Sequence, residues 1–206
     1  MKKVTKARLA GVAAIVLVAA GVISGCSWIS PEAQMDRQLK SELADMVEGA
    51  QDATWQFRGE LAADPEAAIP EVGGIADARA ALSDPTLEIP PGIWTLIDLA
   101  KTDEGTALTL TTKVDVTRGG GFFISSDEGR VCFVLLVSPD GSRIDTLPAD
   151  CGDAVGPALG DEVRDDGESI EVYLDELDLR RSVDGSDYRP LPCQCHSGGD
   201  CDCPGG

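Results

Sequence analysis

Apolar side chains in the first third of the chain recur every three or four residues, the spacing that places them on one face of an α-helix. Ser30-Pro31-Glu32 is typical of a helix start, because serine caps a free backbone N–H, proline suits the first helical position and glutamate favours the positive end of the helix dipole. The pattern predicts a core-facing helix from Pro31 to about Ala63, with a bend or an early end at Gly49 or Gly59. The stripe consists of Met35, Leu39, Leu43, Met46, Val47, Ala50, Thr54, Phe57 and Leu61.

A proline-rich stretch follows this helix. It predicts a connecting segment, because proline is a strong breaker of regular structure, and it contains one short helical pattern over Ile75–Leu82. The prolines are Pro65, Pro70, Pro85, Pro90 and Pro91.

After Pro91 the apolar period changes to two, which predicts β-strands. Leu108–Val116 alternates with polar residues and should have one exposed face, whereas Val131–Val137 is apolar throughout and predicts a central strand covered on both faces. Short turn sequences between the strands favour antiparallel pairing of neighbours. The predicted strands are Ile93–Leu99, Ala107–Val116, Phe122–Ile124, Arg130–Ser138, Arg143–Leu147 and Glu168–Leu174, and the turns are Asp103-Glu104-Gly105, Asp127-Glu128-Gly129 and Ser138-Pro139-Asp140-Gly141.

Together these elements predict the α+β class, with a long N-terminal helix packed on an antiparallel β-meander. We expect one domain over residues 31–189, followed by a flexible cysteine- and glycine-rich tail over 190–206. A long helix laid over such a meander resembles the architecture of pilin-like proteins. No activity follows from that resemblance, since folds of this kind host many functions.

The chain begins with basic residues and continues with 15 apolar or small residues, Leu9–Ile23. This run is shorter than the roughly 20 residues that a transmembrane helix needs. Ser24-Gly25-Cys26 then resembles the lipobox of bacterial lipoproteins, which implies a signal peptide over 1–25, diacylation of Cys26 and a short linker over 26–30. We therefore expect attachment through lipid to the extracytoplasmic face of the cell membrane, because two acyl chains anchor stably.

The net charge restricts the partners. The 206 residues carry a formal charge of −19, and removal of residues 1–25 leaves 13 basic and 36 acidic residues, a charge of −23. Affinity for nucleic acid comes mostly from basic side chains that neutralise phosphates, so we exclude nucleic acid as a partner. A protein partner at the cell surface and cations remain.

Seven cysteines are present, and six remain when Cys26 carries lipid. A hairpin turning at Gly141 would bring Cys132 and Cys151 together, and an oxidising compartment favours a disulfide between them. Two free buried thiols, or pairing with the tail, are the alternatives.

The tail contains two Cys-x-Cys pairs around the only histidine, a donor set suited to zinc or to Cu(I). Over about 11 residues it resembles metallothionein-type clusters. Two disulfides, Cys193 with Cys203 and Cys195 with Cys201, are the competing interpretation, and a redox role is the third. The candidate metal ligands are Cys193, Cys195, His196, Cys201 and Cys203.

Searches for hydrolase, Walker and zinc-protease motifs find nothing, and the only histidine lies in the tail, so we expect no enzymatic activity. Our first hypothesis is a non-enzymatic binding module of unknown ligand on a lipid anchor, without a resident cofactor. The alternative is a metal-handling lipoprotein that uses the tail for Zn or Cu. An acid-catalysed hydrolase is third, because acidic residues are dense from Asp161 to Asp178.

Overall fold

The computed structural model describes residues 30–84, 87–89, 91–120, 123–152 and 170–188. Contacts divide the chain into two compact units, Met1–Asp36 and Arg37–Gly206. Of the described residues, the first includes the opening turns of the long helix, and the second includes the rest of that helix and a seven-stranded sheet. The α+β class is therefore confirmed.

Helix α2 spans Pro31–Gln56. Its predicted start is confirmed, since the Ser30 hydroxyl accepts a hydrogen bond from the Ala33 backbone N–H at 3.2 Å. The predicted single helix to about Ala63 is interrupted, because Phe57 departs from helical geometry and α3 begins anew at Arg58–Ala63. Arg58 donates to the Trp55 carbonyl at 2.8 Å, which satisfies one of the acceptors left free where α2 ends.

The segment after α3 forms α4 at Pro65–Ala68, a 3₁₀ turn at Ile69–Glu71, strand β1 at Ile75–Asp77 and helix α5 at Arg79–Ser83. The predicted helix over Ile75–Leu82 is wrong in its first half. Those residues instead pair with β2 in parallel, with Ile75 opposite Trp94.

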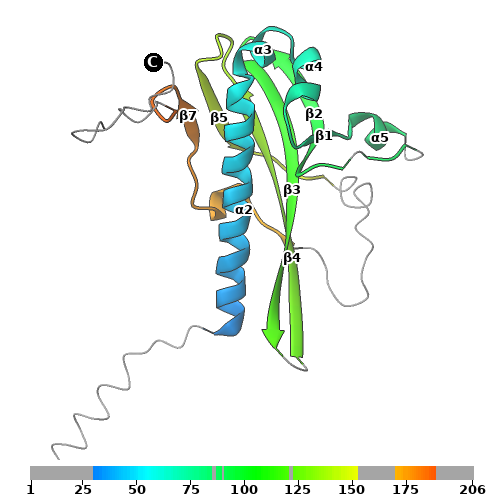
Figure 1. The fold of residues 1–206 in the computed structure, drawn as a ribbon, viewed down its shortest axis with the longest axis vertical. Coiled ribbons are helices and arrows are strands. Elements are labelled where there is room, and N and C mark those ends of the chain that lie inside the picture. The colour runs from blue at the N-terminus through cyan, green and yellow to red at the C-terminus, as the bar shows by residue number, and fades with distance from the viewer. Residues whose placement is uncertain (1–29, 85–86, 90, 121–122, 153–169, 189–206) are drawn as a thin grey trace, which may run out of the picture. The chain divides into compact units, whose positions relative to one another are not determined.

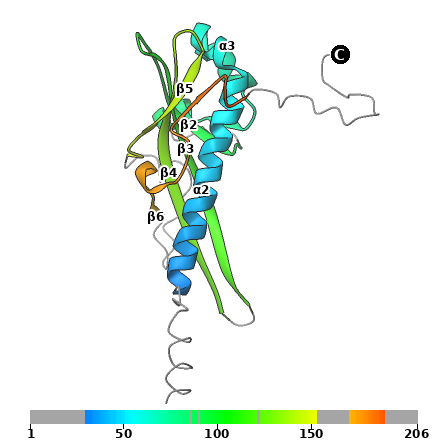
Figure 2. The same ribbon diagram turned by 90° about the vertical axis from the view of Figure 1, so that its left-hand side faces the viewer.

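The remaining strands are β2 at Trp94–Thr102, β3 at Gly105–Gly120, β4 at Phe123–Val137, β5 at Arg143–Pro148, β6 at Ile170–Glu171 and β7 at Ser182–Asp184. Their order is β1-β2-β3-β4-β5-β7, with β6 beside β4 (Figures 1 and 2). Strands β2 to β5 form the predicted antiparallel meander. The sheet as a whole is mixed, because β1 and β6 each pair in parallel.

Strand β4 is longer than predicted. The expected turn at Asp127-Glu128-Gly129 is wrong, since all three residues lie inside β4 and face Val114–Val116 of β3. Gly129 serves a different purpose there: a Cβ at this position would lie 2.7 Å from a methyl carbon of Leu39, so glycine allows α2 to approach the strand. The β3–β4 pairing continues to Gly120 opposite Phe123.

One face of the sheet packs against the apolar stripe of α2 from Arg37 onward, and the core includes Leu43, Val47, Leu110 and Phe133. The predicted alternation along β3 holds: Leu108 and Val116 are buried while Lys113 and Asp115 are exposed. The stretch Val131–Val137 is central, but its second face is only partly covered, since Val134 and Leu136 are half-buried.

The last described segment lies against α2. Gln51, which is fully buried, donates through Nε2 to Thr146 Oγ1 and to the Arg180 carbonyl. The Tyr188 ring stacks on Trp55 at a centroid distance of 4.6 Å, and its hydroxyl donates to Asp52 at 2.6 Å. Burial, together with that carboxylate, raises the pKa of Tyr188.

Within the described ranges, no helix is long and apolar enough to cross a membrane. The predicted signal peptide over 1–25 and the tail over 190–206 lie outside those ranges and stay predictions, as does the boundary of the domain over 31–189.

Candidate functional site

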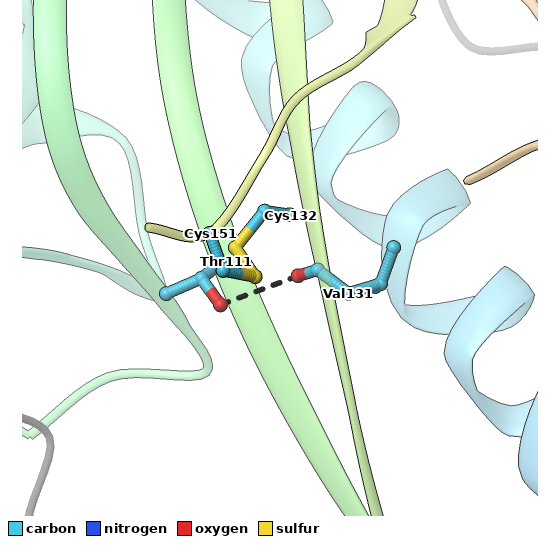
Figure 3. Close-up of a disulfide and its surroundings, with 4 residues drawn as sticks. All are labelled: Thr111, Val131, Cys132 and Cys151. Carbon is cyan, nitrogen blue, oxygen red and sulfur yellow. Dashed lines mark hydrogen bonds between the residues drawn. A yellow bond between two sulfur atoms is a disulfide. The ribbon is translucent and has the colours of Figure 1, made fainter. Parts of the chain in front are cut away.

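The structure joins Cys132 and Cys151 in a disulfide with Cα atoms 5.2 Å apart, as expected from the sequence. Figure 3 shows it on the side of the sheet opposite α2: the Val131 side chain points toward the helix, whereas the disulfide and Thr111 lie on the other side. The Thr111 hydroxyl donates to the Val131 carbonyl at 3.2 Å. We call this side of the sheet the outer face.

The predicted lipid-bearing residue and the predicted metal ligands lie outside the described residues; they are Cys26, Cys193, Cys195, His196, Cys201 and Cys203. Among the residues that the structure does describe, no group of three or more His, Cys, Asp or Glu side chains is placed to hold a metal ion.

The acidic stretch from Asp161 to Asp178 is described only from residue 170. Glu171 lies opposite Arg130 in the β4–β6 register. Glu176 pairs with Lys40 at 2.8 Å, and this hydrogen-bonded contact is the main reason that the pKa of Glu176 lies below its ordinary value. Both carboxylates therefore lie beside basic side chains, Glu171 next to Arg130 and Glu176 next to Lys40.

The main opening in the sheet follows from the unequal lengths of β2 and β3. Pairing between these strands starts at Thr95 opposite Thr111, whereas β3 continues to Gly120 and pairs there with β4. Figure 1 shows β3 and β4 extending beyond the other strands of the sheet. Beyond Thr111, no strand within the described parts of the chain pairs with β3 on the β2 side. We call Thr112–Thr117 the β3 edge.

A cleft of about 750 Å³ lies beside this edge. Its outer-face floor consists of polar side chains from three adjacent strands: Thr95, Thr111, Lys113, Asp115 and Arg130. Its wall comes from the segment before β2 and consists of Leu87, Glu88, Ile89, Pro91, Gly92 and Ile93, while Met46 of α2 and Thr112 complete the lining. Two of the wall residues are unusually exposed for large apolar side chains, Leu87 at 50% and Ile93 at 53%.

The wall is fastened to the strand beside it. The Thr112 hydroxyl donates to the Ile93 carbonyl at 3.0 Å, and the Trp94 indole N–H donates to the Met46 carbonyl at 2.8 Å. Gly49 leaves room for that indole, since a Cβ on it would lie 3.1 Å from the ring. The start of β2 is thus held against both α2 and β3 beside the cleft.

The floor carries charges of both signs. Lys113 lies directly opposite Arg130 and Asp115 lies opposite Glu128, so like charges face each other across the strands. The diagonal ion pair between Lys113 and Glu128, with 3.9 Å between Nζ and Oε1, partly offsets this repulsion. Arg130 is 7% exposed, and burial lowers its pKa, although the guanidinium remains charged.

A smaller pocket of about 440 Å³ lies at α3 and α4. Its lining is mostly apolar, with carboxylates from Glu60, Asp64 and Glu71, and Asp64 also caps α4 by accepting from the Ala67 N–H at 3.3 Å. The cleft beside β3 is the larger of the two, and it alone combines hydroxyls, both charges and aliphatic side chains.

Comparisons of this chain with family models, with curated proteins and with solved structures find no match.

Proposed function

We propose that this protein is a lipid-anchored binding protein on the extracytoplasmic face of the cell membrane, and that it holds a partner protein non-covalently in the cleft beside β3. The observation that carries the proposal is the cleft itself, about 750 Å³ beside a strand edge with no neighbouring strand among the described residues. A volume of this size is in the range of ligand sites.

The lining supports recognition in preference to catalysis. Exposed aliphatic side chains beside charged ones, such as Ile93 near Lys113, are typical of surfaces that bind proteins. The hydroxyl of Thr95, which is half-buried in the cleft lining, adds a hydrogen-bonding group that can fix the orientation of a partner. These residue types suit a non-covalent complex.

Two features support the proposed location of the protein outside the cytoplasm. The lipobox-like Ser24-Gly25-Cys26 favours export and acylation. The Cys132–Cys151 disulfide fits an oxidising compartment, because reducing systems keep such thiols free in the cytosol.

Photo-cross-linking in living cells tests the proposal. A benzoylphenylalanine in place of Glu88, on the cleft wall, should give discrete adducts with another polypeptide on illumination. The same group in place of Gln56, which is exposed on α2 and outside the cleft, should give none. Equal adducts at Glu88 and Gln56, or no adducts at Glu88, would contradict the proposal.

Metal handling by the tail is the second candidate function, and the feature that favours it is the pair of Cys-x-Cys motifs around His196. Mass spectrometry of protein purified without chelators should find about one equivalent of zinc or copper if the tail binds metal. Finding neither metal nor free thiols would instead indicate two disulfides in the tail.

A further inference from the structure

Strand β3 pairs with β2 only as far as Thr111, but the strand itself continues to Gly120. In an edge strand, every second residue directs its N–H and C=O groups away from its one partner. Thr112–Thr117 therefore presents main-chain donors and acceptors on the side where β2 no longer pairs, and its first part, with Thr112, Lys113 and Asp115, borders the cleft. An extended peptide is the ligand that satisfies such a row of groups, because its own backbone has the same spacing.

We propose that the partner enters the cleft as an extended segment of another polypeptide and adds a strand to the β3 edge. This inference rests on the proposed function and specifies how the partner is held. The added strand would take the place in the sheet that β2 leaves at Thr95.

The side chains along the edge define the chemistry of that segment. Lys113 and Asp115 are exposed, point to the outer face and lie two residues apart. Residues directly opposite each other on adjacent strands stabilise the pair when their charges are opposite. The partner strand should therefore carry an acidic residue opposite Lys113 and a basic residue opposite Asp115.

The residue between these two charges would point to the other face of the sheet. There it would lie beside Val114, which is 8% exposed, on the side where Met46 of α2 lines the cleft. An apolar side chain suits that position. The segment thus alternates charged and apolar residues, and charged edge residues such as Lys113 discourage strands that lack matching charges.

A second copy of this chain fits the edge poorly. The symmetric antiparallel register that pairs Lys113 with Asp115 of a second copy is centred on Val114. That register would place the second copy's Thr117 opposite Thr111, a position that Thr95 already holds. Two copies, each with a formal charge of −19, would also repel each other.

The experiment uses full-length protein in detergent and a phage-displayed library of random dodecapeptides as the probe. Selection should enrich peptides in which charged and apolar residues alternate. Binding of a synthetic peptide of that sequence should slow hydrogen–deuterium exchange at the backbone amides of the β3 edge. Methylating the alternate peptide nitrogens that would face β3 should weaken binding about tenfold or more, because several main-chain hydrogen bonds are lost while the side chains remain.

A charge exchange supplies the matched control. Lys113→Glu should weaken binding of a selected peptide, and replacing the acidic residue of that peptide by lysine should restore it. Lys101→Glu, at the far end of β2 and outside the cleft lining, should leave the affinity within about twofold.

The inference is overturned if no peptide is enriched, if the methylated peptide binds as well as its parent, or if the protected amides lie outside the β3 edge. If the backbone amides of the β3 edge are already protected from exchange in the monomeric protein without peptide, another segment of the chain covers the edge. Protection that appears only with concentration-dependent dimers would mean that a second copy does. Cross-links from Glu88 without edge protection would retain the proposed function and reject strand addition.

Discussion

At the scale of single residues, Arg79 connects two carboxylates around the start of α5. Its guanidinium donates to Glu66 at 2.8 and 2.7 Å and to Asp77 at 3.0 and 2.7 Å. The hydrogen bonds from Arg79 are the main reason that the pKa of Asp77 lies below its ordinary value of 3.8. Asp77 also accepts from the Arg79 backbone N–H, so one carboxylate both pairs with the side chain and holds the turn between β1 and α5.

The lowered pKa of Asp77 makes the stability of Arg79→Met depend on pH. A carboxyl whose pKa is lower in the folded state contributes stability above its ordinary pKa, and this contribution is lost as the pH falls through the folded value. We expect Arg79→Met to lower the unfolding free energy at pH 7 by about 0.5–1 kcal/mol, a modest loss because Asp77 is partly exposed. The difference from wild type should shrink as the pH falls below 3.8.

Urea unfolding at several pH values measures this difference. Arg37→Met, which removes an exposed charge on α2, is the control and should differ little from wild type at every pH. A deficit in Arg79→Met that stayed constant down to pH 2 would contradict an electrostatic origin.

The disulfide explains why Thr111 departs from the alternation of β3. The sequence pattern places Thr111 on the wet face with Thr109 and Lys113, yet it is 1% exposed. The Cys132–Cys151 bridge lies beside it on the outer face, and its hydroxyl is satisfied by the Val131 carbonyl (Figure 3). A pattern of polar and apolar residues contains no information about such a covalent cover.

Replacing both bridged cysteines by alanine should lower the unfolding free energy by about 3 kcal/mol. The bridge closes a loop between residues separated by 19 positions, and this restricts the conformational entropy of the unfolded chain. Denaturant unfolding of Cys132→Ala/Cys151→Ala and of wild type measures the loss. Wild type treated with reductant should approach the double variant. A double variant as stable as the wild type without reductant would show that the bridge does not constrain the unfolded state.

At the scale of elements, the long amphipathic helix and the meander were predictable because their signals are local and repeated. The stripe from Met35 to Leu61 identifies the core face over many turns, and β3 alternates over ten residues. Strands β1 and β7 have three residues each, too few for a period, and of the strand predicted over Glu168–Leu174 the described residues form only the two-residue β6. Their pairing depends on tertiary contacts such as the one between Val172 N–H and the Arg130 carbonyl, at 2.8 Å.

The cleft was not predicted for a related reason. It depends on where β2 stops relative to β3, and strand ends are less certain than strand existence in any sequence pattern. Two signals were present. The predicted strand Ala107–Val116 is longer than its partner Ile93–Leu99, and Pro91 lacks the N–H that would continue the ladder.

Gln51 joins three elements, and its replacement tests how the last described segment is held. Its Nε2 group binds Thr146 on β5 and the carbonyl of Arg180 ahead of β7. We expect Gln51→Leu to lower the unfolding free energy by about 1–3 kcal/mol, because the buried Thr146 hydroxyl and the Arg180 carbonyl lose their donor. Hydrogen–deuterium exchange at the backbone amides of β7 should also become faster.

Gln56→Leu is the matched control, since this glutamine is exposed on the same helix. It should change stability by less than about 0.5 kcal/mol. A Gln51→Leu protein as stable as wild type, with unchanged exchange in β7, would mean that the Tyr188–Trp55 stack alone fixes this segment to α2.

At the scale of the whole molecule, the acidic charge bears on how the protein would be held at a membrane. A net charge of −23 after removal of residues 1–25 keeps such a protein soluble and repels anionic lipid headgroups, so the polypeptide itself has little attraction to a membrane surface. Membrane association should therefore depend on the acyl chains that we expect on Cys26. A charged surface held near a membrane only by lipid would leave the cleft available to partners in the same compartment.

Cys26→Ala tests this dependence directly. The wild-type protein should sediment with membranes and carry the mass of its acyl chains, because two chains anchor stably where one is marginal. The variant should move to the soluble fraction, since it lacks the acyl chains and its acidic surface is repelled by anionic headgroups. Cys203→Ala is the control: it also removes one cysteine, lies in the tail, and should sediment like wild type. Cys26→Ala protein that still sediments with membranes after a salt wash would rule out acylation as the anchor and, with it, the interpretation of Ser24-Gly25-Cys26 as a lipobox.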